Sequence, residues 1–279
     1  MILVTGATGK VGRHLVTGLF AEGAAVRALT RGSQEPALPA GAEVTRWDPA
    51  QPATLVAALA GATAVFINVT AVGGVIGELM TAASLAGTGH AVMLSSLTVQ
   101  DNGVQPYSIG AHHKAVEDQV RASGLAATFL RCGGFAANTL AWAPMIRAES
   151  VVRAPYADAA TAPIAERDIA AAAVRVLLDD GHAGASYVLT GRQSLTQAGH
   201  AQAIGAAIGR LVRFEELSAE AFRQATAGYL PAAAADDMLR YLAAYSGRTA
   251  QMSPDLEVIT RRPATTFSDW AVEHAASFR

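Results

Sequence analysis

The chain opens with Met1-Ile2-Leu3-Val4-Thr5-Gly6-Ala7-Thr8-Gly9-Lys10-Val11-Gly12, and this stretch decides the fold. The apolar run over residues 2–5 predicts a buried strand, and residues 11–22 have the apolar spacing of a helix. Three glycines spaced three apart stand between them. Glycine permits a sharp turn, close approach of the backbone to a phosphate and tight helix–strand packing, while the helix N-terminus offers unpaired N–H groups. The stretch therefore predicts a turn that binds a pyrophosphate.

A phosphate-loop NTPase motif does not fit this stretch. Gly9-Lys10 is followed by Val11 rather than Ser or Thr, and Val4 stands where that motif needs its first glycine. A tight turn without a ligand is the structural alternative. In the dinucleotide interpretation, the residues expected to contact the cofactor here are Gly6, Thr8, Gly9, Lys10, Val11 and Gly12.

The composition excludes several classes of partner. The chain has 279 residues, a formal net charge of −2 and no Lys/Arg cluster, which argues against nucleic acid as a partner. No apolar run approaches the roughly 18 residues of a membrane span, so we expect no membrane association. The first strand begins at Ile2, which leaves no room for a signal peptide, and Cys132 has no second cysteine to pair with. We therefore expect a cytoplasmic protein.

Strand-like and helix-like segments alternate through the first half of the chain. The expected strands are 2–5, 25–30, 43–46, 64–69, 91–97 and 127–131, and the expected helices lie near 11–22, 52–60, 74–87 and 109–123. Such βαβ units predict an α/β fold with a doubly wound parallel sheet. Residues 133–164 read as a helix followed by a loop. Further helices are expected at 168–180, 195–209, 218–227, 232–245 and 264–277, with a strand at 186–190.

This order of elements predicts two interleaved parts. Residues 1–132 and 165–190 form the expected dinucleotide-binding domain, and residues 133–164 and 191–279 form a smaller, mostly helical cap.

The end of the second expected strand predicts the cofactor. An acidic residue there would bind the ribose 2′-hydroxyl of NAD, whereas an arginine suits the 2′-phosphate of NADP. The chain has Arg31 and no carboxylate at this position, so we expect NADP(H). Asp48 either contacts the adenine amino group or serves as a turn residue. Thr70 and Ser95, after or within the next strands, complete the expected cofactor contacts.

Several segments together resemble the NmrA-like group of atypical short-chain dehydrogenases/reductases. The segments are Val4–Gly9, Val26–Arg31, Met93–Ser96, Ala122–Phe135, Arg167–Ala170, Tyr187–Gly191 and Ile208–Arg210. The group contains NADPH-dependent quinone and dye reductases, isoflavone-type reductases and a regulator that binds a dinucleotide without known chemistry. The resemblance implies a Rossmann fold and a nicotinamide cofactor, and an oxidoreductase activity is the first expectation.

The wider superfamily uses a serine at the end of strand five and a Tyr-x-x-x-Lys motif on the next helix. Here Ser95 and Ser96 end the strand, and Lys114 has the matching spacing. Gly110 stands where the tyrosine should be. Tyr107 lies seven residues before Lys114, ahead of Ser108, a plausible N-cap.

Three alternatives for the chemistry remain open on these residues. Lys114 anchors the cofactor while water, His113 or Tyr107 supplies the proton; or Lys114 is itself the acid, as in the isoflavone-type relatives; or the site is inert and the protein is an NADP(H) sensor that acts through a protein partner. His112 and His113 titrate near neutrality, but at most one can face the site. Glu117 is expected to pair with Lys114 on the same helix face.

The expected substrate pocket follows the sixth strand. Phe135, Asn138 and Trp142 share one helical face, and Tyr156 lies in the following loop; core packing against the cap is the alternative. An aromatic lining favours a planar acceptor such as a quinone or enone. Cys132 reads as a buried inert thiol, and no cluster has metal-ligand spacing. A homodimer is left open as the assembly.

Overall fold

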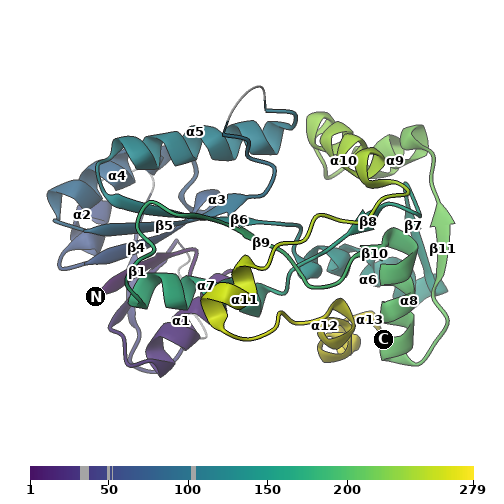
Figure 1. Ribbon diagram of the computed structural model, residues 1–279, viewed down its shortest axis with the longest axis horizontal. Helices are drawn as coiled ribbons and strands as arrows, with labels where there is room; N and C mark the ends of the chain where they lie inside the picture. The colour runs from purple at the N-terminus through teal and green to yellow at the C-terminus, as the bar shows by residue number, and fades with distance from the viewer. Residues whose placement is uncertain (32–37, 49–50, 52, 102–104) are drawn as a thin grey trace.

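The computed structural model describes residues 1–31, 38–48, 51, 53–101 and 105–279 of the chain. Its centre is a seven-stranded sheet covered by helices on both faces, with a separate cap beyond one end of the strands (Figure 1). The strands are β1 (Ile2–Thr5), β2 (Val26–Thr30), β3 (Glu43–Arg46), β4 (Ala64–Asn68), β5 (His90–Ser96), β6 (Ala126–Cys132) and β9 (Ser186–Leu189).

The strand order is β3-β2-β1-β4-β5-β6-β9, and every neighbouring pair is parallel. The predicted doubly wound Rossmann sheet is therefore confirmed. The order reverses between β1 and β4, and ligands of such sheets bind outside the carboxyl ends of the strands at this switch point. The glycine turn follows β1 and so lies at that point.

Helices cover both faces of the sheet, and each face forms a separate hydrophobic core with its helices. One face carries α1 (Gly12–Ala21), α7 (Glu166–Leu178) and α11 (Asp255–Thr260). The other carries α2 (Ala53–Leu59), α3 (Val69–Val72), α4 (Ile76–Leu85) and α5 (Ser108–Ala122), with the 3₁₀ turn η1 (Gly73–Val75) before α4. Ala170, Ala172 and Ala173 of α7 are buried, and this helix packs against α1. Small side chains allow this close packing of helices.

The cap has its own core, around the fully buried Trp270. Its helical elements are η2 (Ala136–Trp142), α6 (Ala143–Glu149), α8 (Gln197–Ile208), α9 (Ala219–Thr226), α10 (Ala232–Tyr245), α12 (Phe267–Glu273) and α13 (Ala275–Phe278). Two small sheets complete it: β7 (Val151–Ala154) pairs with β11 (Arg213–Glu216), and β8 (Ala160–Thr161) pairs with β10 (Leu195–Thr196).

The structure differs from the sequence expectation in the second half. Residues 133–164 begin with the expected helical part, η2 and α6, but the expected plain loop contains β7 and β8, because partners more than 30 residues away complete these strands. The expected helix at 264–277 is divided into α12 and α13 at His274. Residues 255–260 form the unexpected α11, which packs on α7 and β9 rather than in the cap, and Asp255 accepts a hydrogen bond from the Val188 N–H at 2.7 Å.

Within the described part of the chain, no helix is both long enough and apolar enough to span a membrane.

Candidate functional site

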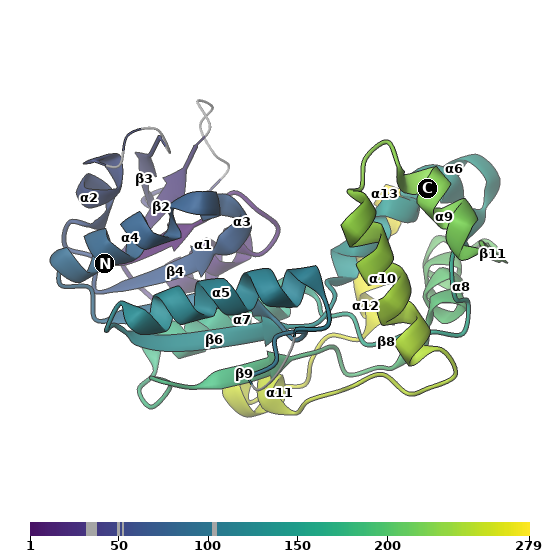
Figure 2. The ribbon, with the colours of Figure 1, turned by 90° about the horizontal axis from the view of Figure 1, so that it is seen from above.

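A cleft of about 810 Å³ separates the carboxyl ends of the strands from the cap. Figure 2 shows the cap beyond the strand ends, with α10 beside the end of α5 that begins at Ser108. The glycine turn contributes Lys10 and Val11 to the cleft, and the ends of β4, β5 and β6 and the start of α5 form the rest of its sheet-side wall. The opposite wall comes from η2, α8 and α10. The cleft thus joins the glycine turn to the cap.

The glycine turn has the geometry that the sequence predicts. Gly6 has φ +64°, a left-handed conformation that side chains disfavour, and the Gly9 N–H donates to the Gly6 carbonyl at 2.9 Å. A Cβ on Gly12 would lie 2.1 Å from the Gly6 oxygen. The helix α1 that follows has no side-chain cap and no acidic residue in its first turn. Its N-terminus therefore suits an anion, and these residues fit a dinucleotide pyrophosphate.

The other expected cofactor contacts are spread around the turn. Thr70 and Ser95 line the cleft, and Lys10 donates from Nζ to the Ala137 carbonyl of the cap at 3.3 Å. Arg31 is exposed directly after β2. Asp48 accepts a 3.0 Å hydrogen bond from the Gln51 side chain, which agrees with its turn alternative.

The place of the superfamily tyrosine is physically filled. A Cβ on Gly110 would lie 2.7 Å from the Thr98 carbonyl oxygen, so the loop after β5 occupies the space that a side chain would need. Tyr107 is the N-cap residue of α5 and lines the cleft; its ring stands edge-on to Tyr241 of α10, with centroids 5.9 Å apart. Burial raises the pKa of its hydroxyl. Tyr107 is thus held against the cap.

Ser108 was expected as the N-cap of α5, but it is the first helical residue. A side chain of α10 instead accepts hydrogen bonds at the N-terminus of α5: the Ser108 N–H donates to the Asp237 carboxylate at 2.6 Å, and the Ser108 hydroxyl donates to the same oxygen. Arg240 in turn pairs with Asp237. Sequence analysis missed this contact because the two residues are 129 positions apart.

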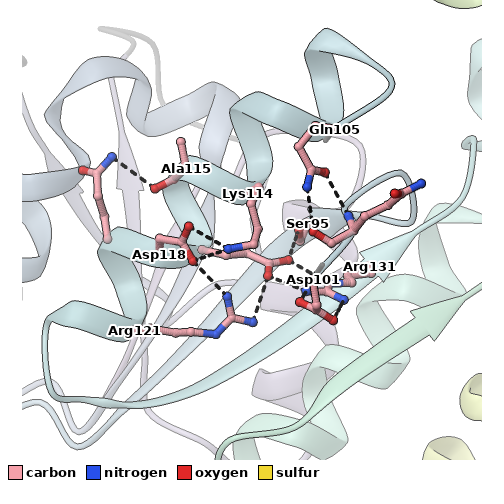
Figure 3. Close-up of polar contacts among 11 residues, drawn as sticks. Ser95, Asp101, Gln105, Lys114, Ala115, Asp118, Arg121 and Arg131 are labelled. Carbon is pink, nitrogen blue, oxygen red and sulfur yellow. Dashed lines mark hydrogen bonds and ion pairs between the residues drawn. The ribbon is translucent and has the colours of Figure 1, made fainter. Parts of the chain in front are cut away.

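Lys114 and His113 occupy different sides of α5. Lys114 donates from Nζ to both carboxylate oxygens of Asp118, at 2.6 and 2.7 Å (Figure 3), and it is absent from the residues that line the cleft. His113 lines the cleft. Its Nδ1 lies 2.9 Å from the Ile109 carbonyl, which can only accept, so Nδ1 carries the proton and Nε2 is left with a lone pair. Burial lowers the pKa of His113. The adjacent His112 is exposed.

Glu117 was expected to pair with Lys114, but Lys114 pairs with Asp118 instead. Glu117 is fully buried at the centre of an ionic network. The Ser95 hydroxyl donates to its Oε1 at 2.6 Å, and Arg131 donates to both of its oxygens, at 3.0 and 2.7 Å. Arg121 adds a 3.0 Å contact. Ser95 was expected to contact the cofactor, but in this structure its hydroxyl donates its proton to Glu117.

The same network holds the loop that leaves β5. Arg131 forms a bidentate pair with Asp101, at 2.8 and 2.6 Å (Figure 3). The pair lowers the pKa of Asp101, chiefly through its hydrogen bonds to Arg131. Because Leu97 and Thr98 of this loop line the cleft, the network positions one of its walls.

Three of the four expected substrate residues line the cleft: Phe135, Asn138 and Trp142. Tyr156 does not; it packs beside Phe222 and lines a separate hollow of about 530 Å³ between α9 and α10. Cys132 lines the cleft as a buried thiol whose pKa is raised by burial. Sequence analysis missed the cap residues of the cleft, because no motif marks them; they include Gln197, His200, Phe222, Met238, Tyr241 and Leu242.

The family profile of the NmrA-like proteins matches residues 1–271. The chain belongs to the NmrA-like family. A (4-alkanoyl-5-oxo-2,5-dihydrofuran-3-yl)methyl phosphate reductase of Streptomyces griseus is 38% identical over 281 residues, which cover 100% of this chain and 99% of that protein. An NAD(P)H azoreductase of Xenophilus azovorans is 35% identical over 285 residues, covering 100% of this chain and 99% of that one.

Among solved structures, the NADPH-dependent quinone oxidoreductase of Escherichia coli, complexed with NADPH, has a TM-score of 0.82. It is 26% identical and covers 98% of this chain and 99% of its own. The predicted resemblance to the NmrA-like family is confirmed by these comparisons. These relatives are named as reductases, and the matches extend over nearly the whole length of each chain. The oxidoreductase class predicted from the sequence agrees with their names.

Proposed function

We propose that this chain is an NADPH-dependent reductase that transfers a hydride to a small planar acceptor of the quinone or enone type. One observation carries the proposal: a single cleft connects the glycine turn, which fits a dinucleotide, to a wall that contains Phe135 and Trp142. A flat aromatic surface favours a planar acceptor. The reductase names and NAD(P)H use of the relatives support the same activity.

The cofactor would lie across the switch point of the sheet. The turn Gly6–Gly12 and the N-terminus of α1 would hold the pyrophosphate, and Arg31, directly after the carboxyl end of β2, would pair with the 2′-phosphate. We expect Arg31→Ala to weaken NADPH binding about tenfold or more and to leave NADH binding unchanged, since only NADPH carries this phosphate. Titration of both cofactors measures the effect; an equal loss for both would remove Arg31 from the site.

When bound, NADPH supplies the hydride, and one further proton completes the reduced acceptor. On α5, His113 is the titratable side chain that faces the cleft. With Nδ1–H held by the Ile109 carbonyl, its Nε2 can deliver a proton only from the protonated ring. Burial lowers the pKa of His113, so we expect the rate to rise as pH falls towards that pKa if this residue is the donor. A pH-independent rate would exclude His113 as the donor and leave water or Tyr107, which also lines the cleft.

Lys114 remains a proposed cofactor anchor. Its ammonium group must leave Asp118 to reach the cleft. Lys114→Ala therefore distinguishes two arrangements. Loss of NADPH binding would show that the side chain moves when the cofactor binds, and unchanged binding and turnover would show that its role is the ion pair with Asp118.

The decisive experiment follows the nicotinamide absorbance of NADPH in the presence of a panel of quinones and aromatic enones. A reductase consumes NADPH with at least one acceptor. The alternative, a sensor that binds NADP(H) without turnover, has one observation in its favour: the loop carbonyl at Thr98 excludes a tyrosine at position 110. Tight NADPH binding without turnover on every acceptor would favour that alternative.

We also infer that the protein works in the cytoplasm, where NADPH is supplied, because its lone cysteine, Cys132, is a buried free thiol. A homodimer stays a prediction, and light scattering of the purified protein tests it.

A further inference from the structure

His200 is an unusual residue for the place it occupies. It lies on the buried side of α8, is 1% exposed, and lines the cap wall of the cleft. Its ring stands edge-on to Phe267, with centroids 4.5 Å apart and an interplanar angle of 70°. The buried positions that follow it on the same helix, such as Ala201 and Ile204, are apolar. An apolar ring would therefore satisfy the packing as well as histidine does.

The imidazole of His200 has an unmet hydrogen bond. Its Nε2 is buried and has no partner among the residues that the structure describes. A buried polar atom without a partner lowers stability, because it loses its hydrogen bonds to water and gains none. Because His200 lines the cleft, a small movement of its ring would let a ligand atom complete this hydrogen bond.

The charge of His200 limits what that ligand atom can be. Burial lowers the pKa of the ring to about 4, so the imidazole is neutral at neutral pH. A neutral ring offers one N–H donor and one lone pair, which suit a carbonyl or hydroxyl oxygen. A carboxylate or phosphate would instead be matched by a cationic group.

The polar side chains that line the same cleft include Gln197, one helical turn before His200, and Asn138 of η2. We propose that His200 determines acceptor specificity by hydrogen bonding, through Nε2, to a second neutral oxygen of the acceptor, remote from the atoms that are reduced. The preferred acceptors then carry two oxygen functions, as a 1,4-quinone or a hydroxylated enone does. The inference rests on the proposed function, because it assigns the class of acceptor for that same cleft.

The test is a binding measurement that does not require turnover. The protein saturated with NADP⁺ is titrated anaerobically, by calorimetry, with 1,4-dihydroxynaphthalene and with 1-naphthol, which lacks the second oxygen. We expect the wild-type protein to prefer the dihydroxy compound, and His200→Phe, which keeps a ring of similar shape, to lose that preference by about tenfold or more. His200→Gln, which keeps a donor and an acceptor, should restore part of the preference.

Other outcomes separate the two proposals. A preference that is unchanged in both variants, or an equal weakening of both ligands, overturns the role of His200. If no quinone consumes NADPH yet the preference depends on His200, the reductase proposal fails while the recognition of a second oxygen stands. Thermal unfolding of each variant shows whether it is folded; should His200→Phe fail to fold, the ligand preference of His200→Gln against the wild type decides.

Discussion

Replacement of Glu117 by glutamine tests the buried network that supports the cleft. The wild-type carboxylate is fully buried and accepts from Ser95, from Arg131 twice and from Arg121. The amide of Glu117→Gln keeps the volume but removes the negative charge and turns one acceptor into a donor. Arg131, which is 7% exposed, then keeps only Asp101 as a charged partner.

The expected cost is large for a change of so few atoms. Removal of one partner from a buried ion pair destabilises proteins by roughly 3–5 kcal/mol when the remaining charge is left unpaired. Because Arg131 keeps Asp101 as a partner, we expect the lower end of this range. The neighbouring Asp118 is the matched control: it pairs with Lys114 and Arg121 on the same helix, but its side chain is 54% exposed. Asp118→Asn should cost no more than about 1 kcal/mol, since exposed ion pairs contribute little.

Urea denaturation, followed by circular dichroism, measures both values. We expect the free energy of unfolding to fall by about 3 kcal/mol in Glu117→Gln. Because Arg131 also holds Asp101, the KM for the acceptor should rise in this variant and stay unchanged in Asp118→Asn. Equal, small losses of stability in the two variants would refute the reasoning, for they would show that the buried carboxylate contributes no more than the exposed one.

Three further predictions concern the turn, the cap contact and pH. Gly12→Ala places a Cβ 2.1 Å from the Gly6 carbonyl oxygen, so NADPH binding measured by fluorescence should be lost, whereas Gly74→Ala, with nothing within 4 Å, should bind normally. Asp237→Ala removes the carboxylate that accepts from the N-terminus of α5, so the free energy of unfolding in urea should fall by about 1 kcal/mol and the KM for the acceptor should rise. An unchanged KM would show that this contact does not shape the cleft. His200 has its pKa lowered to about 4 when folded, against 6.5 unfolded. Between these values the unfolded chain binds the extra proton, so stability falls as pH drops from 6.5 to 4, by about 3 kcal/mol; His200→Phe should remove this part of the pH dependence, and identical pH profiles would contradict it.

The elements that local sequence determines were predictable. The strand at Ile2–Thr5, the turn after it and the start of α1 follow from a contiguous pattern of apolar residues and glycines, and the structure has them within a residue of the expected bounds. The parallel order of the sheet also follows, because right-handed βαβ connections leave few topologies.

The contacts that join distant segments were not predictable from spacing. Glu117 was expected to pair with Lys114 because i,i+3 residues are helix neighbours, but its partners Ser95 and Arg131 come from β5 and β6. The pairing of β7 with β11 joins residues about 60 positions apart, and each strand alone has only four residues. The partner of Lys114 also could not be read from its spacing: in this structure the side chain binds Asp118, while the adjacent His113 lines the cleft.

The central claim is that the cleft carries out hydride transfer from NADPH to a quinone-type acceptor. The most direct measurement mixes the NADPH-loaded protein with one equivalent of a 1,4-quinone in a stopped-flow instrument and follows the nicotinamide absorbance. We expect NADPH to be consumed and hydroquinone to form in equal amount, faster than in a mixture without protein. Persistence of bound NADPH with every quinone and enone tested would contradict it.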